Sequence, residues 1–343
     1  MKRLIARMST MLAGVALASA ALTPQAAALS ASAPAPNLAA DIASRLVPQT
    51  VSADATDYWT PERMRDAVEL DKIELSRLPD LGDVRVGEPM SVAPSPAADL
   101  LRLPRLLPGL GGGGSDADES TGSPWTDGGD VVATAGRVFF TIDGRDASCS
   151  GNAVTSENKS TVITAGHCVK YQGSWHSDWV FVPAYHDGKA PYGEWPAAST
   201  HTTPQWDASE DINYDIGAAV VRSVGGQRLT DVVGGQGIAF NQPRGQRAYA
   251  FGYPAADPYD GSRLIYCAGT TFDDFLFSND LGLNCDMTGG SSGGPWFVGF
   301  DPLRGIGMQN SVNSFGYVFL PDVMFGPYFG DTARQLYEDV QNR

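Results

Sequence analysis

From residue 131 onward, short runs of β-branched and aromatic residues alternate with turn residues, and this pattern restricts the fold more than any other feature. Short strands at regular spacing, without long helical segments between them, are typical of all-β sandwiches and barrels. The sequence therefore predicts an all-β domain. Its expected strands cover residues 137–142, 160–163, 179–183, 216–221, 247–253, 295–300 and 317–320.

The one clear helix pattern lies near the end of the chain. Ala333, Leu336, Tyr337 and Val340 are spaced at i, i+3, i+4 and i+7, which places them on one face of a helix. Asp331 precedes them and is a residue type that caps helix N-termini. We therefore expect an amphipathic helix to close the domain.

Residues 164–168 read Thr-Ala-Gly-His-Cys and follow one of the predicted strands. Small residues allow a tight turn here, which would leave the His167 side chain uncovered. An imidazole can take up and return a proton near neutral pH, as a general base must. A lone histidine is usually structural, and His176, His186 and His201 are interpreted in that way. His167 differs because its whole pentapeptide forms a recognisable pattern.

Asp215 stands at the head of an apolar run, residues 216–221. A carboxylate in this position can be buried, where it fixes the tautomer and orientation of a neighbouring histidine. Asp207 and Asp211 lie close by in the sequence, but neither leads into an apolar run. The sequence therefore favours Asp215 as the orienting carboxylate.

Ser292 lies in a glycine-rich loop, residues 289–295. Glycine on both sides permits strained backbone angles and a close approach to a substrate. The amides of Gly290 and Ser292 can then point at one spot and form an oxyanion hole. A Gly/Ser surface linker is the alternative, but the apolar run at 295–298 indicates a core strand instead. Ser292 is thus the candidate nucleophile.

The segments TAGHC, YDIGAAVV and GSSGGP resemble the His, Asp and Ser motifs of the trypsin/chymotrypsin-like serine peptidases, in that family's order. The resemblance covers about residues 131–343 and is nearest to the bacterial, glutamyl endopeptidase-like branch. It implies two orthogonal six-stranded β-barrels with the site in the cleft between them. It also implies that Ser292 is the nucleophile, His167 the general base and then acid, and Asp215 the orienting carboxylate. No cofactor is expected.

One position departs from the eukaryotic digestive members of this family. These members have Asp directly before the nucleophile, where it pairs with the new N-terminus after activation. Ser291 occupies this position here and cannot form the ion pair. Activation through that salt bridge is therefore not expected.

The resemblance also suggests residues of a substrate pocket. Asp286 lies six residues before the nucleophile, where trypsin-type enzymes place the acid that binds Lys or Arg, although it could equally be a loop carboxylate. Ser311 and Asn313 are the other expected pocket residues. Their stretch, residues 308–313, lacks the histidine of glutamate-specific relatives, so strict glutamate specificity is not expected.

The four cysteines all lie in the C-terminal part of the chain and fall into two local pairs. Four cysteines allow three pairings, and this spacing favours Cys149–Cys168 and Cys267–Cys285. A zinc site is the alternative, but no C-x-x-C spacing occurs, and we expect no metal.

The N-terminus has the features of a secretory signal peptide over residues 1–28: a basic start, an apolar stretch of about a dozen residues, and an A-x-A site at 26–28. A membrane anchor is the alternative, but the stretch is short for a span. Residues 29–129 differ in composition from the rest. They end in a Gly-rich segment, residues 101–123, that resembles a flexible linker. We expect 29–129 to be a propeptide, with a permanent N-terminal domain as the alternative, and 130–343 to be the peptidase domain.

The formal net charge of −15 is opposite in sign to that of a typical nucleic-acid binder. Together, these features predict a secreted, monomeric serine endopeptidase that acts on polypeptides and does not insert stably into membranes. The sequence has two alternative interpretations. A non-catalytic binding protein of the same fold would typically lack a triad member. An α/β-hydrolase esterase would need the order Ser, Asp, His and alternating strands and helices.

Overall fold

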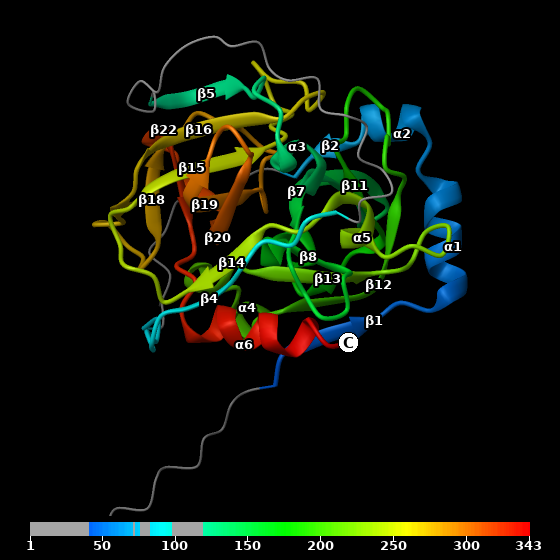
Figure 1. Ribbon diagram of the computed structural model, residues 1–343, viewed down its shortest axis with the longest axis horizontal. Coiled ribbons are helices and arrows are strands. Elements are labelled where there is room, and N and C mark those ends of the chain that lie inside the picture. Colours follow the sequence, from blue (N-terminus) through cyan, green and yellow to red (C-terminus); the bar gives the residue numbers. More distant parts are fainter. Residues whose placement is uncertain (1–40, 71–72, 76–82, 98–118) are drawn as a thin grey trace, which may run out of the picture. The chain divides into compact units, whose positions relative to one another are not determined.

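The computed structural model describes residues 41–70, 73–75, 83–97 and 119–343 (Figure 1). The expected signal peptide and the glycine run at 111–114 lie outside the described residues. Residues 40–343 belong to one compact unit. Within the described residues, no helix is both long enough and apolar enough to cross a membrane.

Six strands of the first half form a closed barrel, in the order β12-β11-β6-β7-β8-β13, with β13 pairing back to β12. Nearly every residue of these strands is buried, because the barrel interior and the neighbouring elements cover both faces. The third barrel strand in chain order, β8, ends at Thr164, just before the turn that carries His167. The barrel strands are β6 (Ala135–Ile142), β7 (Arg145–Ala153), β8 (Thr161–Thr164), β11 (Ser177–Pro183), β12 (Trp195–Thr202) and β13 (Gly217–Val221).

The second half pairs its strands in two sheets rather than in one closed ring. The larger sheet has the order β4-β14-β20-β19-β15-β16-β5, and the smaller has β17-β18-β22-β21-β3. The mostly β architecture, with one closed barrel and these further sheets, agrees with the expected double-barrel fold. The strands contributed by this half are β14 (Gly237–Phe240), β15 (Arg247–Gly252), β16 (Ile265–Thr270), β17 (Phe272–Asp273), β18 (Leu281–Asn284), β19 (Pro295–Asp301), β20 (Ile306–Val312), β21 (Phe315–Tyr317) and β22 (Leu320–Gly326).

Residues before 130 add elements to both halves. Strands β1 and β2 pair with β12 and β7, whereas β3, β4 and β5 pair with β21, β14 and β16 (Figure 1). Two helices connect β1 to β2 and lie against the first barrel. The elements are β1 (Ala43–Leu46), α1 (Gln49–Tyr58), α2 (Pro61–Asp66), β2 (Val68–Glu69), β3 (Ile73–Leu75), β4 (Met90–Val92) and β5 (Ser120–Pro124).

The remaining elements are short, apart from the C-terminal helix α6 (Asp331–Val340). The four residues predicted to face inward on α6 are all buried, as expected. Gly330, not Asp331, holds the cap position, and Asp331 begins the helix instead. The short elements are α3 (Asp130–Thr134), η2 (Gly166–Cys168), β9 (Lys170–Tyr171), β10 (Ser174–Trp175), α4 (Pro204–Ser209), η3 (Ile212–Tyr214) and α5 (Leu229–Val233).

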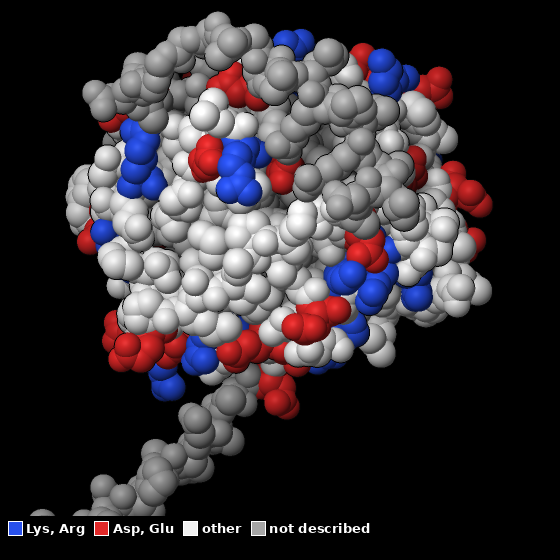
Figure 2. Space-filling view, viewed as in Figure 1, with Lys and Arg blue, Asp and Glu red and all other residues white. Residues whose placement is uncertain are grey.

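Figure 2 shows one face of the molecule, with an uncharged area in its lower middle, a group of basic and acidic side chains above that area, and acidic side chains along the lower edge where α6 lies. Helix α6 supplies Asp331, Glu338 and Asp339, which pair with Arg334 and Arg343. These exposed pairs contribute little to stability.

Two sequence expectations are wrong in detail. The predicted strand at 317–320 is interrupted: Tyr317 ends β21, Leu320 begins β22, and the exposed Val318 and Phe319 form the turn between them. The predicted flexible linker ends too late, because Ser120–Pro124 forms strand β5 on the edge of β16. Trp125 then packs edge-on against Phe251 and Tyr266, which gives this polar segment an apolar anchor.

Candidate active site

The His167 ring is held by Asp215. Its Nδ1 lies 2.7 Å from Asp215 Oδ2, and its backbone amide donates to Asp215 Oδ1 at 2.8 Å. Both side chains are fully buried. An ionised carboxylate can only accept hydrogen bonds, so Nδ1 must carry the proton of the neutral ring. The lone pair of that ring is therefore on Nε2, the atom that faces away from Asp215.

Ser314 completes the contacts of this carboxylate. Its hydroxyl donates to Asp215 Oδ2 at 2.5 Å, so the aspartate accepts three hydrogen bonds in all. Ser314 precedes β21 and was not identified from the sequence. It directly follows residues 308–313, but a single serine next to a strand has no local pattern that identifies it as a site residue.

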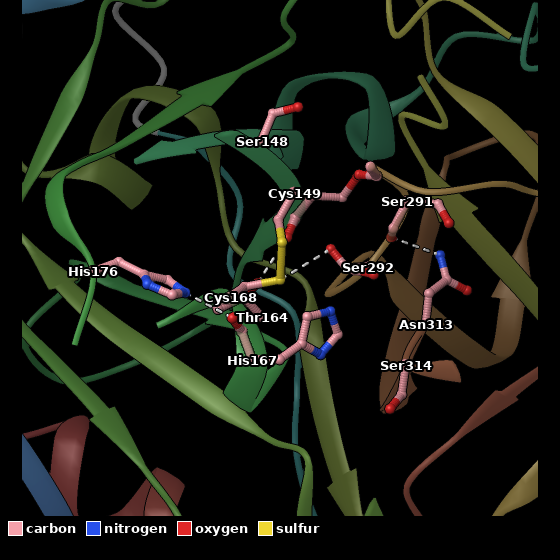
Figure 3. Close-up of a disulfide and its surroundings, with 12 residues drawn as sticks. Ser148, Cys149, Thr164, His167, Cys168, His176, Ser291, Ser292, Asn313 and Ser314 are labelled. Atoms are coloured by element: carbon pink, nitrogen blue, oxygen red, sulfur yellow. Dashed lines mark hydrogen bonds between the residues drawn. A yellow bond between two sulfur atoms is a disulfide. The ribbon is translucent and has the colours of Figure 1, made fainter. Parts of the chain in front are cut away.

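Ser292 lies against the disulfide that adjoins His167 (Figure 3). Its carbonyl oxygen is 3.6 Å from Cys168 Sγ and accepts from the Ser150 amide at 2.7 Å. The structure thus brings Ser292 beside the turn that carries His167. Ser292 Oγ and His167 Nε2 are both buried, and neither has a hydrogen-bond partner in the structure as described.

The glycines of the loop have the conformations that the sequence suggested. Gly290 and Gly293 have φ angles of +87° and +80°, which side chains rarely adopt. A Cβ on Gly293 would lie 2.5 Å from the Ser150 carbonyl oxygen, so the close approach to the first barrel excludes a side chain. The Ser150 hydroxyl in turn donates to the Gly290 carbonyl at 2.9 Å and accepts from the Tyr253 amide.

The Gly290 amide, one of the two predicted oxyanion donors, is already engaged. It donates to the carbonyl oxygen of Leu70 at 3.1 Å. Leu70 belongs to the segment before residue 130 and was not singled out from the sequence. No local sequence pattern distinguishes Leu70 from other apolar residues that follow a charged stretch.

Two disulfides have the pairing that the spacing favoured. Cys149 joins Cys168, and Cys267 joins Cys285. The first links β7 to the His167 turn. His176 supports the same turn, because its Nε2 lies 2.8 Å from the His167 carbonyl oxygen. Burial lowers the pKa of His176 to about 4, so the ring is neutral near pH 7 and Nε2 donates this bond.

The three expected pocket residues differ in their exposure and in their hydrogen-bond partners. Asp286 is partly exposed, and its Oδ1 accepts from the Tyr259 hydroxyl at 2.6 Å. Ser311 is buried and donates to the Pro327 carbonyl. Asn313 is also buried. The substrate-binding role of these three residues stays a prediction.

Asn313 holds the nucleophile loop. Its Nδ2 donates to the Ser291 carbonyl at 3.0 Å (Figure 3). The same nitrogen donates to the Phe251 carbonyl at 2.9 Å, and Oδ1 accepts from Trp296 Nε1 at 2.6 Å. Its backbone exchanges two further hydrogen bonds with residues 293 and 294. The side chain therefore fixes the residue before Ser292.

No family model matches this chain. Among solved structures, the protease Anisep from Arthrobacter nicotinovorans is 44% identical with a TM-score of 0.59, over 62% of this chain and 98% of that one. The thermostable serine protease AL20 from an extremophilic microorganism is 45% identical with a TM-score of 0.59, over 62% and 99%. A Glu endopeptidase shares the fold at 15% identity and a TM-score of 0.52, over 66% and 99%.

A curated protein, the extracellular metalloprotease of Bacillus subtilis, is 38% identical over 71 residues. The match takes in 20% of this chain and 22% of that protein, so the chain spans about a fifth of this relative. Among the described residues, one group has metal-ligand geometry, formed by Cys149, His167 and Cys168. It does not fit a metal, because the two sulfurs are bonded to each other and offer no thiolate.

The family follows from the two relatives above 40% identity. This chain covers almost their whole length, and its own strands form the closed barrel and further sheets of the same architecture. The chain belongs to the bacterial serine proteases of trypsin/chymotrypsin-like fold.

Proposed function

We propose that this protein is a secreted serine endopeptidase that cleaves peptide bonds through Ser292, His167 and Asp215. One observation carries the proposal. The Nδ1–H of His167 is held by Asp215 at 2.7 Å, so the lone pair of Nε2 is unengaged, and the Ser292 hydroxyl, beside the turn that carries His167, also has no hydrogen-bond partner in the part of the chain that the structure describes. A nucleophile, a base and a group that orients the base are what acyl transfer requires.

The proposed reaction has two halves. Ser292 Oγ attacks the substrate carbonyl while His167 Nε2 takes its proton, and the amides of Gly290 and Ser292 stabilise the oxyanion. His167 then protonates the leaving amine, which produces the acyl-enzyme. Water, activated by the same imidazole, releases the acid product and restores the serine. Asp215 holds the ring throughout and stabilises its charged form.

We further propose that residues 1–28 direct export, that 29–129 are removed as a propeptide, and that 130–343 are the active enzyme. Two observations support this division. The share of the chain that matches Anisep, 62%, is close to the share taken by residues 130–343. Two disulfides fit an oxidising compartment.

The test is covalent labelling of the secreted protein with a fluorophosphonate, followed by mapping of the modified residue. We expect modification of Ser292, with loss of peptidase activity. Ser292→Ala should abolish both labelling and activity without unfolding, since it removes one oxygen and no core volume. Ser291→Ala is the matched control, because that hydroxyl donates to the Thr288 carbonyl and should not be labelled. An unlabelled wild-type protein would favour the non-catalytic binding protein instead.

A further inference from the structure

Leu70 bridges the two halves of the molecule at the candidate active site. Its amide donates to the Ser148 carbonyl at 3.0 Å, and its carbonyl oxygen accepts from the Gly290 amide at 3.1 Å. Ser148 lies on β7 of the closed barrel, and Gly290 lies in the loop before β19. The main chain of one residue therefore connects the first barrel to the donor that is expected to bind an oxyanion.

The residues on both sides of Leu70 are also held by main-chain pairing. Val68 and Glu69 of β2 run parallel to Ala147 and Ser148 of β7. Beyond Leu70, strand β3 runs parallel to β21, which directly follows Ser314. The segment thus continues from the disulfide side of the site to the side that carries Ser314.

Side chains before β2 anchor the segment to the first barrel. Arg63 forms an ion pair with Asp146 at 2.7 Å, and Tyr58 donates to the same carboxylate at 2.6 Å. Trp59 is buried against Phe139, with ring centroids 5.3 Å apart. These contacts leave little freedom for the chain that enters the site.

A buried guanidinium reaches the same segment. Arg137 is 1% exposed, and its Nη1 points to the Met64 carbonyl at 3.5 Å and to the Gly261 carbonyl at 3.4 Å. Its Nη2 donates to the hydroxyl of Ser148, whose carbonyl binds Leu70. Burial lowers the pKa of Arg137, so this buried charge depends in part on the Met64 carbonyl of the bound segment.

The catalytic atoms are closed off in this arrangement. Ser292 is 1% exposed and His167 is not exposed at all, although a working site must admit a substrate to both. The Gly290 amide is used by Leu70, so it cannot stabilise an oxyanion until Leu70 leaves. In this arrangement a substrate cannot reach Ser292 and His167, and the Gly290 amide cannot stabilise an oxyanion.

We propose that Val68–Leu70 is an internal inhibitor of the enzyme, whose Leu70 carbonyl occupies the oxyanion hole until the N-terminal segment is removed. This inference rests on the proposed function, because it assumes that Ser292 and the Gly290 amide are catalytic. The bond after Leu70 stays uncut because the chain is held on both sides of it. The chain on the leaving side is paired with β21 from Ile73 onward, so the leaving segment stays near the acyl group, which favours re-formation of the peptide bond.

The experiment compares fluorophosphonate labelling rates of the uncut full-length chain and of the naturally processed enzyme. We expect the full-length chain to react at least tenfold more slowly. Leu70→Pro, which removes the donor to the Ser148 carbonyl, should raise the rate of the uncut chain about tenfold. Leu46→Ala is the control in the same N-terminal segment, because Leu46 lies outside the inhibitor and is 76% exposed; it should react like wild type.

Arg63→Ala provides a second variant in case Leu70→Pro is not exported. It removes the surface pair with Asp146 and the stacking of the guanidinium over the Tyr58 ring, so a smaller rise of about two- to fivefold is expected. Equal labelling of the uncut and processed wild-type proteins overturns the inference, as does a fragment of the wild-type chain that ends at Leu70. Failure of the processed enzyme to label at Ser292 is a different result, which overturns the proposed function and this inference with it.

Discussion

The carboxylate of Asp215 accepts hydrogen bonds from three donors, which come from two different parts of the chain. His167 supplies its backbone amide and its ring Nδ1–H, and Ser314 supplies its hydroxyl. A fully buried charge is tolerated only when its hydrogen-bonding capacity is used in this way. The same contacts leave the His167 ring a single orientation, so the buried aspartate determines where the lone pair of Nε2 points.

Asp215→Asn tests this role of the carboxylate. An amide nitrogen is a donor, so one of its two positions would face the donors on His167 Nδ1 and Ser314. The ring would turn or change tautomer, and we expect kcat to fall by about 10²–10⁴-fold with little change in KM. Steady-state kinetics on a peptide substrate measure this. Asp207→Asn is the control, because that carboxylate, on α4, pairs with Lys170 of β9, outside the site; an equal loss there would contradict the assignment.

The sequence predicted the chemistry of the site better than its surroundings. His167, Asp215 and Ser292 could be chosen because each lies in a local pattern, namely a turn of small residues, the head of an apolar run or a glycine-rich loop. Ser314, Ser150 and Asn313 act through contacts with residues more than 20 positions away, so no local pattern marks them. The polar residues of β5 resemble a linker in the sequence, because their strand conformation depends on edge pairing with the distant strand β16.

At the scale of elements, α1 and α2 are as much a part of the core as the barrel strands. Ala55, Trp59, Met64 and Ala67 are all buried, in one cluster with barrel residues such as Phe139. Trp59 also donates from Nε1 to the Asp178 carbonyl at 2.6 Å. The segment proposed to be removed therefore carries part of the apolar interior, and its loss exposes the barrel residues that it covers.

Trp59→Ala should destabilise the full-length chain by about 3–5 kcal/mol, through lost burial and the cavity that remains. Urea unfolding of the Ser292→Ala full-length chain, which cannot process itself, measures this change. Leu46→Ala is the matched control in the same segment, because Leu46 is 76% exposed and should cost little. If Trp59→Ala is as mild as Leu46→Ala, then this packing does not hold the segment.

At the scale of the whole molecule, a titrating group lies between α1 and the barrel. Glu194 lines a cavity of about 450 Å³ together with Gln49, Ser52 and Arg222. The guanidinium of Arg222 donates to the Val47 carbonyl at 2.6 Å, so it is directed toward the N-terminal segment. Burial alone raises the pKa of Glu194 to about 7. Burial therefore favours the protonated form of this carboxyl while α1 is docked.

Stability of the full-length chain should therefore fall with rising pH. Glu194 binds a proton more readily in the folded chain than in the unfolded one, where its pKa is about 4.5. Its contribution is complete below about pH 4.5 and is lost as the pH rises through about 7. Thermal unfolding of the Ser292→Ala chain across this range measures the slope, and Glu194→Gln should flatten it. An unchanged slope in Glu194→Gln would assign the pH dependence to other groups.

Three strands from the N-terminal segment cover backbone edges of the remaining fold. Strand β1 pairs with Ser199–Thr202 of β12, β4 with β14 and β5 with β16. Release of the segment would leave these edges unpaired, and open edges can recruit other strands. Their amides would also begin to exchange hydrogen with solvent water. Hydrogen–deuterium exchange at β12, β14 and β16 would therefore report when the segment leaves, even in a chain whose nucleophile has been removed.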